Sequence, residues 1–152
     1  MSVMLTQSPE TDALPHAVLF ACTRNAIRSP MAEALLKHLA GTRIYVDSAG
    51  VLPGEPDGFA MAAMKEKGLD ITAHQAKSFD ELWDTSFDLV ISLSPEAHHR
   101  ALEMTRTMAI DAEYWPTLDP SVIDGKRDER LQAYRQCRDQ LAAKLQQRFP
   151  SL

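Results

Sequence analysis

Cysteine is scarce in this sequence, with Cys22 and Cys137 as the two examples among 152 residues. Two cysteines cannot form the dense disulfide framework of a small secreted domain. They also cannot build a zinc site alone, and no Cys-x-x-Cys or His-x-x-x-His spacing accompanies them. The sequence therefore predicts free thiols, a cytoplasmic location and no metal site.

Long apolar runs and a surplus of basic residues are also absent. The longest apolar runs, such as 17–22, are far too short to cross a bilayer. Residues 1–15 contain no Lys or Arg, which argues against a secretory signal. We interpret them as a flexible tail before a single domain of residues 16–152. A net charge of −5 without a basic patch argues against nucleic-acid binding, so neither nucleic acid nor a membrane is an expected partner.

What the sequence does contain is an alternation of apolar runs with helical patterns. A fully apolar run, as in 17–22, is typical of a strand buried on both faces, and further strands are predicted at 43–47, 88–93 and 107–110. Helices are predicted from Ser29-Pro30 to Gly41, with Ser29 as the cap, and at 59–67, 79–83, 94–105 and 127–149. Residues 71–78 and 111–125 are predicted as irregular segments. This order favours a parallel sheet covered by helices on both faces.

The segment from Cys22 to Ser29 is the strongest chemical feature, with Arg28 six positions after Cys22. It joins the end of a predicted strand to a helix, which is where ligands bind in open α/β sheets. Backbone N–H groups in such a loop make an anion-binding concavity, and Arg28 adds a planar cation suited to phosphate oxygens. The same positive surroundings stabilise a thiolate. We therefore predict that Cys22 is a nucleophile toward a tetrahedral oxyanion.

A buried structural cysteine is the alternative interpretation, because free cysteines are among the most buried residues. For Cys22, the strand before it, Ser29-Pro30 after it and Asn25 within the loop favour the catalytic interpretation. Cys137 falls on the apolar stripe of the last predicted helix, so we expect it in the core.

Several segments, in order, resemble the low-molecular-weight protein tyrosine phosphatase family, whose fold is shared by thioredoxin-coupled arsenate reductases. They are Val18 to Glu33, Asp47 to Gly50, Ile71 to Lys77 and Asp119-Pro120. The resemblance extends from about residue 17 to the end of the chain. It implies an α/β three-layer sandwich with a four-stranded parallel sheet in the order 2-1-3-4, flanked by helices.

The resemblance also implies catalytic roles. Cys22 would attack phosphorus and become a phosphocysteine, while Arg28 and the loop N–H groups would hold the phosphoryl oxygens. Asp119 would act as general acid and then as general base. Ser29 would hydrogen-bond the Cys22 sulfur. The positions implied in substrate binding are Thr23, Arg24, Asn25, Ala26, Ile27 and Ser29, and those implied in loop support are Asn25, Ser48 and His74.

No metal or organic cofactor is implied by the resemblance. The expected ligands are a phosphorylated protein or small phosphoester, and a phosphate or sulfate ion in the loop. The expected oligomeric state is a monomer or a weak dimer.

The sequence departs from the family pattern at three places. Arg24 stands where many members have a small residue, often glycine, so we expect either a positive φ there or an added charge at the pocket rim. Ser121, and not an aromatic residue, follows Asp119-Pro120, and residues 51–55 offer no aromatic wall. Residues 79–93 lack the cysteines of thioredoxin-coupled arsenate reductases.

Three functions therefore stay open. The first is a phosphomonoester hydrolase acting on a protein, with uncertain preference for phosphotyrosine. The second is an arsenate reductase that uses an external low-molecular-weight thiol. The third is a non-catalytic oxyanion-binding module, which would need neither Cys22 nor Asp119.

Overall fold

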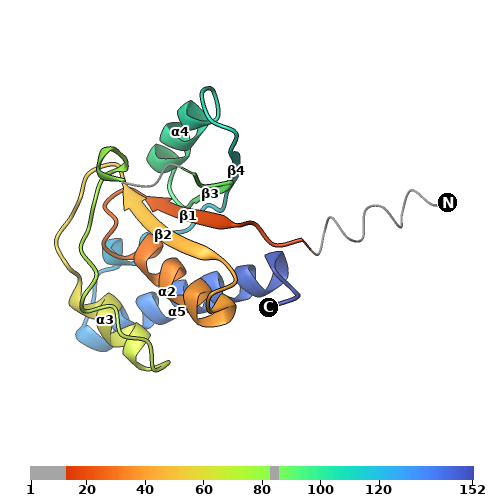
Figure 1. Ribbon diagram of the computed structural model, residues 1–152. Helices are drawn as coiled ribbons and strands as arrows, with labels where there is room; N and C mark the ends of the chain where they lie inside the picture. The colour runs from red at the N-terminus through yellow and green to blue at the C-terminus, as the bar shows by residue number, and fades with distance from the viewer. Residues whose placement is uncertain (1–12, 83–85) are drawn as a thin grey trace.

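A parallel four-stranded sheet forms the centre of the computed structural model, which describes residues 13–82 and 86–152. The strands follow the order β2-β1-β3-β4, and their bounds are β1 (Ala17–Cys22), β2 (Tyr45–Gly50), β3 (Leu89–Ser92) and β4 (Asp111–Tyr114). The predicted fold class and strand order are confirmed (Figure 1). Most of the predicted N-terminal tail, residues 1–12, lies outside the described residues.

Helices cover both faces of the sheet. On one side lie α2 (Arg28–Ala40), α3 (Gly58–Lys65) and α5 (Arg127–Arg148), and on the other lies α4 (Pro95–Met104) (Figure 1). Strand β1 is buried along its whole length because it contributes to both sides. Its residues Val18 and Phe20 pack in the core with α2 and α5, whereas Leu19 and Ala21 pack with α4. This explains why residues 17–22 form an uninterrupted apolar run.

Two predicted strands are displaced along the chain. Strand β2 covers 45–50 and not 43–47, because Ser48, Ala49 and Gly50 continue the parallel register as far as Cys22. Strand β4 covers 111–114 and not 107–110, where turns continue from the end of α4. An edge strand pairs on one side only and can be polar, so the sequence Asp-Ala-Glu-Tyr gave no apolar signal.

The helix ends agree partly with the predictions. Ser94 caps α4 at the predicted helix start, accepting from Ala97 N, and Asp57 caps α3. Helix α2, however, begins at Arg28 after Ile27, which gives no side-chain cap. Ser29 is therefore not the predicted cap but lies within the first turn, where its hydroxyl is directed to Cys22.

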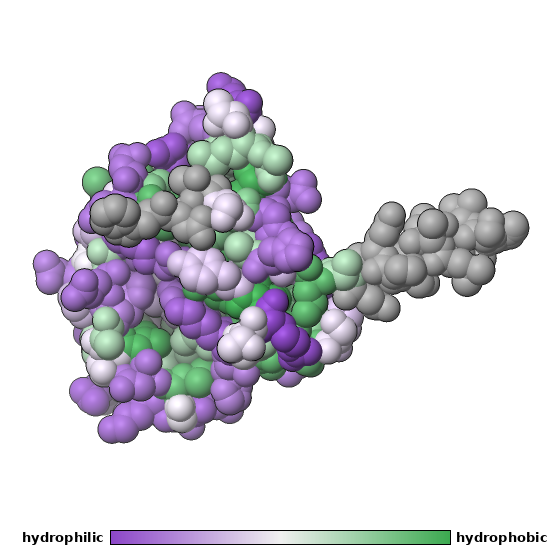
Figure 2. All heavy atoms as spheres, viewed as in Figure 1, coloured by the Kyte–Doolittle hydropathy of each residue, from purple (hydrophilic) through white to green (hydrophobic). Residues whose placement is uncertain are grey.

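Two short 3₁₀ helices complete the fold, η1 (Phe79–Glu81) and η2 (Pro120–Val122). The predicted end of the first at Trp83 lies outside the described residues. The second interrupts the predicted loop 111–125, as does β4. Hydrophilic residues cover most of the face seen in Figure 2. Within the described ranges, no helix has the length and apolar character needed to span a membrane.

Candidate active site

The loop from Cys22 to Ser29 leaves the carboxyl end of β1 and leads directly into α2. Its neighbour β3 ends at the same edge of the sheet, and α4 begins there. A pocket of about 290 Å³ opens at this edge. It is lined by Cys22, Thr23, Arg24, Ala26, Ile27, Arg28, Glu96, Asp119 and Ser121. The structure thus brings the predicted nucleophile, cation and general acid to one cavity.

The Cys22 sulfur is held by two polar contacts although its side chain is almost fully buried. Asn25 N donates to Cys22 Sγ at 3.3 Å, and Ser29 Oγ lies 2.9 Å from the same sulfur. A backbone N–H and a hydroxyl that can donate both stabilise a negatively charged sulfur. This environment differs from an apolar core site, which supplies no donor to a thiolate.

Asn25 fixes the shape of the loop. Its Nδ2 donates to Ser29 Oγ at 2.8 Å and to Ser48 Oγ at 2.9 Å, and its Oδ1 accepts from Lys77 N at 3.0 Å. The His74 Nε2 lies 3.0 Å from Asn25 O and 3.2 Å from Asn25 Oδ1. Ser48 and His74 therefore both contact Asn25 within the loop.

The positive φ expected at Arg24 occurs instead at the next residue. Asn25 has φ of 54°, and no other non-glycine residue in the described ranges has a positive φ. Asparagine enters this region more readily than most residues because its short polar side chain bonds locally. Arg24 thus replaces glycine without the expected backbone strain.

Gly50 supports the loop through its missing side chain. A Cβ built at Gly50 would lie 2.8 Å from Asn25 N and 2.9 Å from Arg24 C. Backbone atoms at these distances cannot move aside easily, so only glycine fits here. The sequence pattern included Gly50 but did not reveal this contact, which depends on the parallel pairing of β2 with β1.

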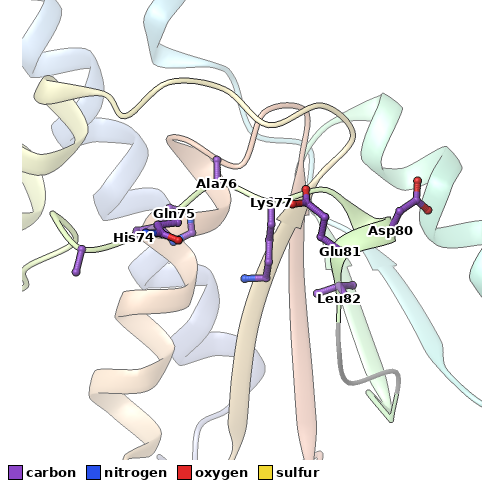
Figure 3. A pocket seen from close by; sticks show the side chains of 8 residues that line it. His74, Gln75, Ala76, Lys77, Asp80, Glu81 and Leu82 are labelled. Carbon is purple, nitrogen blue, oxygen red and sulfur yellow. The ribbon is translucent and has the colours of Figure 1, made fainter.

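A strap of residues 73–82 passes behind the loop. Gly50 N donates to Lys77 O at 2.8 Å, and Lys77 Nζ contacts Asp47 Oδ1 at 2.7 Å. Residues of this strap line a hollow of about 750 Å³. Figure 3 shows their side chains. His74 and Lys77 line that hollow and Cys22 does not, so the hollow is distinct from the pocket that Cys22 lines.

Arg28 is buried and linked to the loop that carries Asp119. Its NH1 group donates to Thr117 O at 2.8 Å and, more weakly, to Leu93 O at 3.4 Å. A guanidinium has five N–H donors, so Arg28 can make these bonds and still present donors to an anion in the pocket that it lines. The contacts with Thr117 and Leu93 join residues far apart in sequence, and no local pattern could have predicted them.

Asp119 lies in the pocket and also forms the predicted turn. Its Oδ1 accepts from Ser121 N at 2.9 Å and from Ser121 Oγ at 2.7 Å, which starts η2. Thr117 fixes the start of this short loop through Arg28. The carboxyl group is therefore positioned from both sides of the loop.

Glu96 is a pocket residue that the sequence analysis missed. It stands in the first turn of α4 and accepts from Thr23 Oγ1 at 3.2 Å. The predicted Ser94-Pro95 helix start after β3 could have indicated it, because that start must lie at the same edge as Cys22.

Cys137 lies in the core on α5, as predicted. Burial raises the pKa of its thiol to about 12, so it is protonated at neutral pH. Both cysteines are free. Among the described residues, no cluster of His, Cys, Asp and Glu has the arrangement of a metal site.

Comparison with known proteins gives one family and two named activities. A family profile described as low molecular weight phosphotyrosine protein phosphatase matches residues 17–152. An arsenate reductase of Bacillus subtilis (strain 168) is 31% identical over 130 residues, covering 86% of this chain and 92% of that protein.

Solved structures of both kinds have this fold. An arsenate reductase in the phosphate binding state has a TM-score of 0.69 at 26% identity, covering 90% of this chain and 98% of its own. A YwlE arginine phosphatase mutant with a phosphorylated active site serine has a TM-score of 0.72 at 28% identity, covering 90% and 95%.

Proposed function

Because this chain belongs to the low molecular weight phosphotyrosine protein phosphatase family, we propose that it hydrolyses phosphomonoesters through a phosphocysteine at Cys22. One observation carries the proposal. The Cys22 sulfur receives a backbone N–H and lies beside a hydroxyl, at a pocket that Arg28 and Asp119 also line. A nucleophile, an oxyanion-binding cation and a proton donor are what this two-step reaction needs.

The first step forms the S–P bond and breaks the bond from phosphorus to the leaving oxygen. Asp119 donates its proton to that oxygen, while Arg28 and the N–H groups of the loop hold the other phosphoryl oxygens. These donors are fixed before the substrate binds, since Asn25 is anchored by Ser48, His74 and Lys77. They therefore need little reorganisation as charge develops on the oxygens.

The second step releases inorganic phosphate. Asp119, now a carboxylate, takes a proton from water as the water oxygen attacks phosphorus. The S–P bond breaks and the electron pair returns to Cys22 Sγ, where the Ser29 hydroxyl can donate to it. A free thiolate is needed at the start and end of each cycle, which agrees with the expected cytoplasmic, reducing surroundings.

Hydrolysis of p-nitrophenyl phosphate tests the proposal. Wild type should release p-nitrophenol and Cys22→Ser should not, whereas Cys137→Ala is the matched control that removes the other cysteine and keeps activity. With a poorer leaving group, Asp119→Asn should lower kcat on the order of 10² to 10⁴-fold. Turnover that persists in a folded Cys22→Ser variant would disprove the mechanism.

Arsenate reduction is the second candidate, favoured by the name of the Bacillus subtilis relative. The same pocket suits arsenate, another tetrahedral oxyanion. Cys22 would attack arsenic, and two external low-molecular-weight thiols would be oxidised to one disulfide as As(V) becomes As(III). Cys137 does not suit this redox role, because its buried thiol is protonated. Thiol-dependent arsenite production without p-nitrophenol release would favour this candidate, and phosphate binding with neither activity would favour a binding module.

The side chains near the pocket mouth affect which phosphate esters the protein prefers. Leu118 and Val122 flank the Asp119 turn, and Leu52 N donates to Thr23 O, so these exposed residues belong to segments that adjoin the pocket. Their aliphatic character gives no flat aromatic surface for a phosphotyrosine ring. We therefore propose that selectivity for phosphotyrosine is weak. A panel of phosphotyrosine, phosphoserine and phosphoarginine peptides would measure it, and a strong preference for phosphotyrosine would contradict it.

A further inference from the structure

Arg24 differs from the rest of the loop in its exposure. Asn25 and Arg28 are buried, whereas Arg24 is exposed and lines the pocket with Cys22. Its backbone is fixed, because Arg24 O accepts from Gly54 N at 2.9 Å. The residue is therefore held at the mouth of the pocket by the segment that follows β2.

Gly54 also directs the Arg24 side chain. A Cβ built at Gly54 would lie 3.0 Å from Arg24 Cβ and 3.2 Å from Arg24 Cδ. The aliphatic part of the arginine thus lies along the glycine backbone, as long charged side chains do when their charged end stays in water. This packing limits the directions that the guanidinium can take.

Arg24 shares the pocket with one other cation, Arg28, and with two carboxylates, Glu96 and Asp119. Within the described ranges, no hydrogen bond or ion pair engages the Arg24 guanidinium, whereas the pocket carboxylates Glu96 and Asp119 accept from Thr23 and Ser121. Arg28, the other pocket cation, is tied to Thr117 O and serves the phosphoryl group. The guanidinium of Arg24 is therefore available to bind a further anion.

We propose that Arg24 is a specificity residue that binds a second anionic group of the substrate, a carboxylate or a phosphate close to the reacting phosphoryl group. This inference rests on the proposed function, since it assumes that the phosphoryl group occupies the loop. Guanidinium groups pair with both anions through two parallel hydrogen bonds. The substrate class is thus a polyanionic phosphoester, either a phosphopeptide with neighbouring acidic residues or a small phosphorylated acid.

Binding to Cys22→Ser tests the inference without turnover. One arm compares phosphopeptides that differ only in acidic or neutral residues beside the phosphorylated residue. The other compares 3-phosphoglycerate with glycerol 3-phosphate, which lacks the carboxylate. We expect the more acidic ligand of at least one pair to bind about twofold to fivefold more tightly, and less so at high salt.

The affinity ratio is the affinity of the more acidic ligand of a pair divided by that of the less acidic one. Variants at Arg24 in the Cys22→Ser background show whether this affinity ratio depends on Arg24. Arg24→Gln should bring the ratio to about one, and Arg24→Glu should invert it. Arg106→Gln is the matched control. Arg106 is an exposed arginine that follows the C-terminal end of α4, whereas the pocket residue Glu96 lies in the first turn, so this variant should leave the affinity ratio unchanged. Equal affinities in both arms, or a ratio that survives Arg24→Gln, would overturn the inference.

The outcome is distinguishable from failure of the proposed function. If wild type does not hydrolyse p-nitrophenyl phosphate while the binding ratio depends on Arg24, the proposed activity fails and anion recognition stands. If hydrolysis occurs and the ratio is one, the inference about Arg24 fails alone.

Discussion

At the scale of single residues, the shape of the loop from Cys22 to Ser29 depends on a neighbouring residue that has no side chain. Gly50 has no Cβ, and one built there would meet Asn25 N at 2.8 Å. Gly58, at the start of α3, has nothing within 4 Å of the same position. The two glycines therefore form a matched pair for testing close backbone approach.

We predict that Gly50→Ala displaces the loop and lowers kcat/KM about tenfold or more, because small displacements of catalytic groups are costly. Gly58→Ala should keep full activity and leave stability unchanged or raised by up to ~1 kcal/mol, since alanine favours helix. Steady-state kinetics and urea denaturation measure both. Normal activity in Gly50→Ala would show that the contact with Asn25 does not shape the site.

Asn25 combines a left-handed backbone with a network of side-chain hydrogen bonds. Asn25→Gly and Asn25→Ala both remove the network, but only alanine opposes the positive φ. We predict that both lose most activity and that the alanine variant is less stable than the glycine variant by about 1 kcal/mol. Denaturation midpoints measure the difference. Equal stabilities would contradict a strained φ at this residue.

The residue types that line the site were also its most predictable feature. Cys22 and Arg28 could be proposed from their spacing and Asp119 from the family resemblance, and the structure places all three around one pocket. Thr117 could not, because its contact with Arg28 joins distant parts of the chain. Glu96 could have been indicated by the predicted helix start after β3, but not by its residue type alone.

At the scale of elements, α3 is fixed to α5 by a carboxylate between two arginines. Glu66 accepts from Arg135 and from Arg138, and Arg138 also donates to Ala63 O. Arg138 is buried, so it needs these acceptors. Hydrogen bonds from Arg135 and Arg138 lower the pKa of Glu66 from 4.5 to about 2.

This shift predicts how stability depends on pH. A carboxyl group with a lowered folded-state pKa stabilises the fold above its unfolded value of 4.5, and this contribution is lost as pH falls toward 2. Glu66→Gln should therefore be less stable than wild type at pH 7, with a gap that narrows below about pH 5. Urea denaturation between pH 7 and pH 3 measures it. A gap that stays constant over that range would contradict the role of the carboxylate charge.

Strands were predicted well where burial on both faces requires apolar residues, and poorly at the edge of the sheet. Strand β1 shows as a wholly apolar run because both faces are covered. Strand β4 pairs with β3 alone and is half exposed, so its polar residues did not indicate a strand. The predicted start of α2 was wrong because Ser29 has the residue type of a helix cap, whereas in the structure its hydroxyl lies beside the Cys22 sulfur.

At the scale of the whole molecule, the parallel sheet explains why the site is where it is. The ends of β1 and β3, the start of α4 and the loop before η2 meet at one edge. Cys22 of β1, Glu96 of α4 and Asp119 at the start of η2 line the pocket there. Alternating strands and helices were enough to predict this edge as the ligand site. The supporting strap behind Asn25 was not, since its hydrogen bonds arise from an irregular segment.

The central claim is that Cys22 carries the phosphoryl group between the two steps. In Asp119→Ala, p-nitrophenyl phosphate should still phosphorylate Cys22, because its leaving group needs little help from an acid, whereas hydrolysis loses its base. Mass spectrometry of rapidly quenched Asp119→Ala should find one added phosphoryl group on the peptide that contains Cys22. Its absence, or a phosphoryl group on any other residue, would contradict the account.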